Sequence, residues 1–149
     1  MYLIGRKKEQ TILEKMLSSK EAEFVAIYGR RRVGKTYLIQ QCLSQKGVYL
    51  ECTGTKDGNL KTQLLNFTQS FSTTFYPGIP ISSPKSWREA FELLTQEIIK
   101  HKNKKIILFF DELPWLATRK SKLLQNLDYF WNTQWSKLPQ VKLIVCGSA

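Results

Sequence analysis

The fold of this chain is decided by one stretch, Gly29-Arg30-Arg31-Arg32-Val33-Gly34-Lys35-Thr36. It matches the pattern G-x-x-x-x-G-K-[ST], which is typical of a phosphate-binding loop between a strand and a helix. The two glycines allow a tight turn in which successive backbone N–H groups point into one concavity. In this pattern Lys35 reaches the β- and γ-phosphates of a nucleotide, and the Thr36 hydroxyl binds Mg²⁺. We therefore predict that the whole stretch 29–36 contacts a nucleotide.

The sequence on either side of the loop fits this prediction. Residues 24–28 are apolar and favour a buried strand, whereas residues 36–44 favour a short helix that ends before Gly47. The N-terminus of that helix would add its positive dipole end to the attraction for phosphate. The arginines at 30–32 either face phosphate or a partner, or are solvated loop residues.

The composition indicates one globular domain, residues 1–149. Hydrophobic residues make up 42% of the chain and aromatic residues 12%, as in folded proteins. No apolar run approaches the ~20 residues of a membrane span, and the N-terminus lacks the order of a signal peptide. The three cysteines have neither metal-binding nor redox spacing, so we interpret them as reduced thiols of a cytoplasmic protein.

The net charge is +11, with dense basic segments at 30–32, 100–105 and 119–122. A basic surface favours an anionic partner, with nucleic acid first. The other interpretation is that these residues belong to solvated loops, because the charge is shared almost evenly between the two halves of the chain. No recognised nucleic-acid-binding motif is present.

The remaining patterns predict alternating strands and helices. Strands are expected at 24–28, 48–53, within 106–112, and at 141–146, and helices at 6–19, 36–44, 60–75, 87–98 and 123–138. Mostly apolar strands that alternate with helices predict parallel pairing through right-handed crossovers. The expected fold is a three-layer α/β domain with a mostly parallel sheet and the ligand at the C-terminal strand ends.

A second chemical feature ends the most hydrophobic run, at Asp111 and Glu112. A carboxylate at the tip of a buried strand can hold Mg²⁺ through its water shell, and Asp111 is the candidate. Glu112 is the candidate general base that polarises an attacking water. Two carboxylates at the end of an apolar strand are costly unless a cation offsets them, although they could also begin a solvated turn.

These two features argue against other classes of phosphate-binding protein. A GTPase would carry glycine three residues after the Mg²⁺ aspartate, where this chain has Pro114. Its base-reading Asn-Lys-x-Asp motif is also missing, since the segment 103–106 lacks the final aspartate. A small-molecule kinase would not need a glutamate beside the aspartate. The pair of carboxylates therefore favours hydrolysis of ATP by an activated water.

Several motifs together resemble the archaeal-type ATPases, which are AAA-like, STAND-related P-loop ATPases. They are Ile4-Gly5-Arg6 with Glu9, Ile27 to Thr36, Phe110-Asp111-Glu112, and Cys146-Gly147-Ser148. The resemblance covers essentially the whole chain and implies a P-loop fold of the ASCE type. It implies that the last strand, 141–147, lies between the strands that carry the Walker A motif (29–36) and the Walker B motif (Phe110-Asp111-Glu112).

The resemblance also implies roles for residues outside the two central motifs. Ser148 corresponds to the sensor position that responds to the γ-phosphate, and Gly5-Arg6-Lys7-Lys8-Glu9 corresponds to the segment that packs near adenine. Members of the family continue with a fifth strand and a lid, so we expect this chain to be a core truncated before both. Strand 23–28 would then be an unpaired edge, through which copies could self-associate.

Three functions follow from the sequence. The first is the ATP-binding and Mg²⁺-dependent ATP-hydrolysing core of an AAA/STAND-like ATPase, with Lys35, Glu112 and Ser148 as the catalytic residues and Thr36 and Asp111 as the metal ligands. The second is a nucleotide-binding fragment without hydrolytic activity. The third is a basic module that associates with nucleic acid.

Overall fold

The computed structural model describes residues 7–29 and 34–148. The helices are α1 Lys7–Ser18, α2 Lys35–Leu43, α3 Leu60–Phe75, α4 Trp87–Lys100, α5 Leu113–Leu116 and α6 Leu123–Thr133. The strands are β1 Glu23–Gly29, β2 Val48–Thr53, β3 Ile106–Asp111 and β4 Val141–Ser148, with a 3₁₀ turn, η1, at Trp135–Lys137. All four predicted strands and all five predicted helices are therefore present, with small shifts of their ends except in the last helix, which is shorter than predicted.

The sheet is parallel throughout and has the order β1-β4-β3-β2. Strand β4 therefore lies between β1 and β3, as the family resemblance implied. The register places Gly29 beside Ser148 and Thr53 beside Asp111. The C-terminal ends of the four strands thus meet at one end of the sheet, where a parallel α/β fold binds its ligand.

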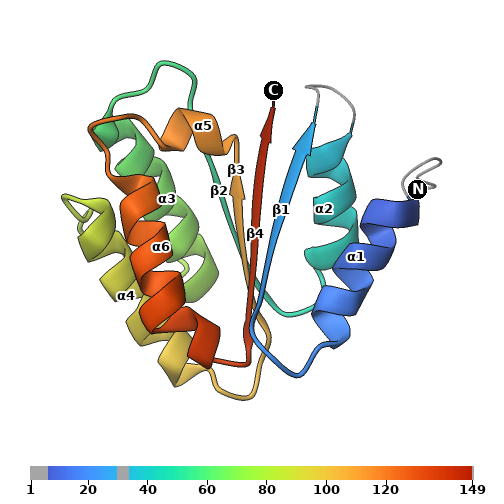
Figure 1. Ribbon diagram of the computed structural model, residues 1–149. Coiled ribbons are helices and arrows are strands. Elements are labelled where there is room, and N and C mark those ends of the chain that lie inside the picture. The colour runs from blue at the N-terminus through green and yellow to red at the C-terminus, as the bar shows by residue number, and fades with distance from the viewer. Residues whose placement is uncertain (1–6, 30–33, 149) are drawn as a thin grey trace.

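Helices cover both faces of the sheet, which confirms the three-layer architecture. Helices α1 and α2 lie on one face, and α3, α4 and α6 lie on the other (Figure 1). Strand β3 shows why both faces are covered: Ile107 and Phe109 pack toward α1 and α2, whereas Leu108 and Phe110 pack toward the other helices. Since side chains alternate along a strand, a continuous apolar run of this kind needs a hydrophobic layer on each side.

Helix α4 begins at a serine cap. The Ser86 hydroxyl oxygen accepts a hydrogen bond from the Glu89 N–H at 3.1 Å. The Glu89 carboxylate reaches one residue further back than in the usual capping box, because it accepts from the Lys85 N–H at 2.7 Å. Two backbone donors at the start of the helix are satisfied by this arrangement.

One local prediction about the helices was wrong. The last helix was expected to continue to Leu138, but α6 ends at Thr133 and is followed by the turn η1. The break lets Trp135 turn into the core, where its indole N–H donates to the Thr95 hydroxyl at 2.8 Å. Residues 113–116, directly after β3, form the short helix α5.

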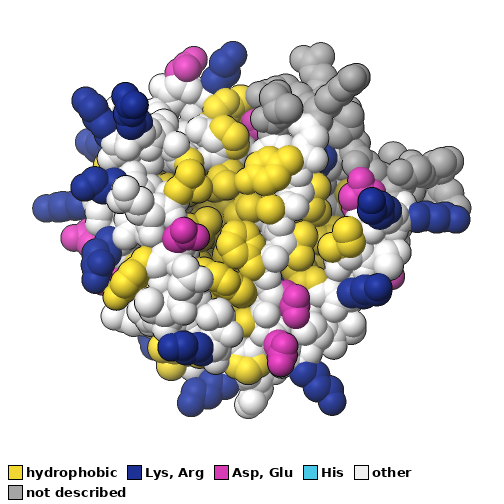
Figure 2. All heavy atoms as spheres, in the orientation of Figure 1, with side chains coloured by type: hydrophobic (Ala, Val, Ile, Leu, Met, Phe, Trp, Pro, Cys, Tyr) yellow, Lys and Arg dark blue, Asp and Glu magenta, His cyan; other side chains and the backbone are white. Residues whose placement is uncertain are grey.

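Strand β1 has a paired side and an unpaired side in the described sheet. It pairs only with β4 among the described residues, so the edge position predicted for 23–28 is confirmed. Alternate residues of β1 are exposed, and Phe24 and Tyr28 keep 37% and 59% of their surface accessible. Figure 2 shows a broad apolar area near the middle of this view of the molecule.

Within the described ranges no helix is long and apolar enough to cross a membrane.

Candidate functional site

The predicted phosphate-binding loop connects the end of β1 to the start of α2. Arg30, Arg31, Arg32 and Val33 lie outside the described residues, so the site is seen through the residues on either side of them. Gly34 immediately precedes α2 with φ +83°, in the left-handed region that favours glycine. The second glycine of the motif is therefore required by the backbone conformation from which the helix begins.

Lys35 is the first residue of α2, and its side chain is buried although it carries an ammonium group. The Lys35 Nζ donates to the Gly29 carbonyl oxygen at 3.4 Å. The side chain thus folds back across the loop to the last residue of β1, so the ammonium lies beside the segment that was predicted to hold phosphate.

Thr36 and Asp111 are 75 residues apart in sequence and are in direct contact. The Thr36 hydroxyl donates to Asp111 Oδ2 at 2.7 Å, and the other carboxylate oxygen, Oδ1, accepts from the Glu112 N–H at 2.8 Å. Asp111 is the last residue of β3 and is only 4% exposed. The structure therefore brings together the two residues that the sequence predicted as metal ligands.

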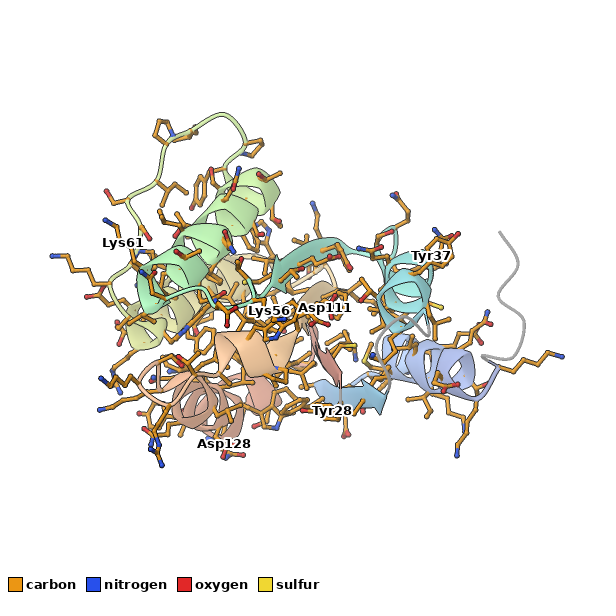
Figure 3. The ribbon with its side chains drawn as sticks, turned by 90° about the horizontal axis from the view of Figure 1, so that it is seen from above. Tyr28, Tyr37, Lys56, Lys61, Asp111 and Asp128 are labelled. Atoms are coloured by element: carbon orange, nitrogen blue, oxygen red, sulfur yellow. The ribbon has the colours of Figure 1, made fainter. Side chains whose placement is uncertain are left out.

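Strand β4 lies between β1 and β3, and its residue Cys146 is close to the Asp111 carboxylate. Burial raises the pKa of the Cys146 thiol to about 12, and the negative charge of Asp111 adds to the rise. The residue is therefore a neutral thiol at physiological pH. Viewed from above, Asp111 lies near the middle of the molecule, between the loop that carries Lys56 and the helix that carries Tyr37 (Figure 3).

Glu112 has an unusual backbone conformation. Its φ of 52° and ψ of 47° place it in the left-handed region, directly after β3 and before α5. Such a conformation costs a non-glycine residue about 1–2 kcal/mol, and it recurs at functional sites. The Glu112 carbonyl accepts from the Trp115 N–H at 2.9 Å, which fixes the turn that follows the strand.

Residues after β2 support this turn from the side. The Gly54 N–H donates to the Asp111 carbonyl at 3.0 Å, and a Cβ on Gly54 would lie 2.6 Å from the Glu112 carbonyl oxygen. A larger residue at position 54 would therefore push the backbone of Glu112 out of place. The backbone that carries both carboxylates is held by close packing as well as by hydrogen bonds.

Gln63 is a residue of this region that sequence reasoning missed. Its side-chain amide donates toward the carbonyls of Thr55, Gly58 and Trp115 at 2.8, 3.2 and 3.1 Å, and its oxygen accepts from the Thr55 N–H at 3.0 Å. The side chain is 1% exposed and joins the loop after β2 to α5. The signal was present in the sequence, because Gln63 interrupts the apolar face of the predicted helix 60–75.

Two further predicted positions are only partly described. The backbone of Ser148 pairs beside Gly29, so the predicted sensor position is at the edge of the sheet next to the loop, while its side chain is outside the description. Gly5 and Arg6 also lie outside the described residues, and Glu9 is in the first turn of α1. Among the residues that can be inspected, no cluster of three or more His, Cys, Asp or Glu side chains is placed to bind a metal ion.

Comparison with known proteins agrees with this arrangement. Residues 3–149 match the family described as an ATPase domain predominantly from Archaea. An uncharacterized ATP-binding protein of Methanocaldococcus jannaschii is 42% identical over 45 residues, which are 30% of this chain and 76% of that protein.

Solved structures share the fold at low sequence identity. A Walker-type ATPase of Pyrococcus abyssi has a TM-score of 0.57 at 24% identity, with 97% of this chain and 45% of that chain covered. Drosophila ORC bound to DNA and Cdc6p of Pyrobaculum aerophilum both have TM-scores of 0.64, at 20% and 16% identity. The match covers 99% of this chain in both cases but only 39% and 40% of those chains, so this chain spans less than half of each of these structures.

The family match supports nucleotide binding as the general function of the domain, and the solved structures support its fold. The chain belongs to the family of ATPase domains found predominantly in Archaea.

Proposed function

We propose that residues 1–149 act as an ATPase core that binds Mg²⁺-ATP and hydrolyses it. The observation that carries this proposal is the 2.7 Å hydrogen bond between the Thr36 hydroxyl and Asp111 Oδ2. It joins the first turn of the helix after the loop to the carboxylate at the end of β3, next to the buried Lys35. A P-loop enzyme needs these three groups together to hold a metal ion and the terminal phosphates.

The donor atoms fit Mg²⁺. Thr36 and Asp111 offer a hydroxyl and a carboxylate, and Mg²⁺ prefers such oxygen ligands while keeping several of its waters. Asp111 is almost fully buried at the end of an apolar strand, where a divalent cation would offset its charge. In this proposal Thr36 holds the metal directly and Asp111 holds it through water. When bound, Mg²⁺ neutralises charge that develops on the β- and γ-phosphate oxygens.

The remaining residues have separate roles in the proposed reaction. Lys35 and the N–H groups of the loop 29–36 stabilise the transferring phosphoryl group. Glu112 accepts a proton from the attacking water and orients it, and the turn that fixes its backbone supports this role. Ser148 at the end of β4 would respond to the presence of the γ-phosphate.

The test is ATP turnover by the wild type and by three variants. Lys35→Ala should abolish turnover through loss of nucleotide binding. Glu112→Gln should keep nucleotide binding and lower kcat by about 10²-fold or more. The matched control is Glu92→Gln, because Glu92 is an exposed glutamate on α4 that pairs with Arg88. Turnover that neither Lys35→Ala nor Glu112→Gln slows would contradict the assigned roles.

A domain that binds ATP without hydrolysing it is the alternative for the same site. It would bind Mg²⁺-ATP in a Lys35-dependent way and show no turnover in the wild type. We favour the hydrolytic proposal over this alternative because the backbone of Glu112, next to the proposed metal ligand Asp111, is held in the left-handed region, and such backbone strain recurs at active sites.

Two interactions beyond ATP are also part of the proposal. The net charge of +11 favours association with nucleic acid, and one structure of similar fold is that of an ORC bound to DNA.

The exposed Phe24 and Tyr28 on the edge strand β1 favour self-association through that edge. Sedimentation velocity of the wild type and of Tyr28→Lys would test the second: a dimer that the variant does not weaken would contradict it.

A further inference from the structure

A cavity of about 570 Å³ lies at the end of the sheet opposite the nucleotide site. Its walls come from the turn after α1, the turn before β3, and the segment that leads into β4. We call it the lysine pocket, and its lining residues are Ser19, Lys20, Ile99, Lys102 to Lys105, Leu138 to Gln140, and Lys142. The N-terminal ends of β1, β3 and β4 lie at the bottom of Figure 1, far from the end that carries the site.

The lining is strongly basic. Lys20, Lys102, Lys104 and Lys105 are exposed around the pocket, and no Asp or Glu is among the lining residues. None of these four ammonium groups has a hydrogen bond or ion pair with any residue that the structure describes. Four unpaired cations from two separate turns repel one another, so an anion placed between them would lower the electrostatic energy.

A fifth lysine forms part of the structure of the pocket. Lys142 is 1% exposed, and its ammonium donates to the carbonyls of Ser19, at 2.9 Å, and Glu21. Burial lowers the pKa of Lys142, and the charge of Lys105 lowers it further, while Glu23 and Glu21 oppose the change. The two hydrogen bonds fix the turn that carries Lys20. The part of the rim that carries Lys20 is therefore held in place by a buried group.

The pocket also has an apolar part. Ile99 is 46% exposed although it belongs to α4, and Leu138 and Pro139 line the same cavity. A solvent-exposed isoleucine beside a ring of lysines suits a ligand with both a flat apolar part and negative charge. A nucleotide unit of an unpaired strand has this character, since its base can leave the stack while its phosphates stay outside.

We propose that the lysine pocket binds single-stranded nucleic acid, with phosphates on the lysine rim and a base against Ile99, Leu138 and Pro139. A duplex would meet only the rim, because its bases are stacked and paired. This proposal gives a location to the nucleic-acid association proposed above, and it does not depend on ATP hydrolysis. It concerns the end of the sheet away from Lys35 and Asp111.

The test measures binding of a fluorescent oligothymidylate by anisotropy over a range of salt concentrations, without ATP. Each phosphate contact that is lost lowers the slope of log K against log salt by about 0.7 for single strands, so Lys102→Gln with Lys104→Gln should reduce it by about 1.4. The matched control is Lys56→Gln with Lys61→Gln, which removes the same charge from exposed residues outside the pocket (Figure 3). The control should leave the slope nearly unchanged.

A third variant separates the apolar contact from the charge. Ile99→Ser should weaken oligothymidylate binding several-fold without changing the salt slope. The proposal would be overturned if the control pair lowered the slope as much as the pocket pair, or if a duplex bound as tightly as the single strand. It would equally be overturned if polyglutamate displaced the oligonucleotide at the same concentration of charge, since the pocket would then be a site for acidic protein segments. A failure of the turnover test at Lys35 would leave each of these outcomes unaffected.

Discussion

Replacing Gln63 with leucine removes the side chain that joins the loop after β2 to α5. The Gln63 amide has two hydrogens and one oxygen, so its four contacts with backbone groups correspond to about three full hydrogen bonds. Each hydrogen bond is worth about 1 kcal/mol net. In the variant the backbone groups that Gln63 contacts would be left without hydrogen bonds in a buried region, where Gln63 itself is 1% exposed. Leucine fills most of the space and recovers part of the loss, so Gln63→Leu should lower the free energy of unfolding by about 2–3 kcal/mol.

Urea denaturation followed by tryptophan fluorescence measures this difference. The control is Gln69→Leu, which makes the same chemical change at an exposed position of the same helix and should stay within about 0.5 kcal/mol of the wild type. The urea dependence of the unfolding free energy should be the same in all three proteins. The reasoning would be refuted if Gln63→Leu unfolded at the same urea concentration as Gln69→Leu, because the four contacts would then contribute nothing.

Other expectations follow from the caps and buried groups. Ser86→Ala should destabilise the fold by about 1 kcal/mol in urea denaturation, because the α4 cap is lost, and Ser86→Asp should restore most of that stability. Equal stability of the wild type and the alanine variant would contradict the capping role. The buried thiols Cys52 and Cys146 have pKa values of about 12, so above pH 9 they stay protonated in the folded protein while they ionise in the unfolded chain. Unfolding free energy should therefore fall as pH rises above 9, by about 1.4 kcal/mol per pH unit per thiol, and a flat pH profile would contradict this. Gly54→Ala should slow ATP turnover more than it weakens ATP binding, because its Cβ would displace the Glu112 carbonyl; an equal change in kcat and affinity would argue against that mechanism.

Much of the fold could be predicted because the signals are local. The apolar run at 106–110 is a buried strand and the apolar stripe at 60–75 is the buried face of a helix, as their patterns predict. The run at 24–28 is also a strand, but the prediction that it is buried is wrong: β1 lies at the edge of the sheet, and alternate residues of it are exposed. The order of the strands did not come from these patterns. It came from the family resemblance, because nothing in the run 141–146 says which neighbours it pairs with.

The break at Gln134 could not be predicted, since the apolar spacing continues through Trp135 and Leu138. The chain leaves the helix there because Trp135 gains a buried hydrogen bond with Thr95, a contact between residues 40 apart in sequence.

The candidate site shows the same division between local and distant information. Motif spacing identifies Lys35, Thr36 and Asp111 one at a time, and the parallel sheet explains why they meet at one edge. The left-handed conformation of Glu112 and the contacts of Gln63 depend on the loop after β2, which carries no motif. The sequence therefore identifies the groups that we propose act on ATP more readily than the groups that hold them in position.

Calorimetric titration with ATP, in the presence and absence of Mg²⁺, is the most direct test of the proposed Mg²⁺-ATP site. The wild type should bind Mg²⁺-ATP more tightly than ATP alone. Asp111→Asn should keep binding of ATP but lose the benefit of Mg²⁺, because the neutral amide attracts the hydrated cation less than the carboxylate that contacts Thr36. Lys35→Ala should bind neither form, with its far-ultraviolet circular dichroism unchanged. Wild-type protein that binds no ATP, or a folded Lys35→Ala variant that binds it as tightly as the wild type, would contradict the account.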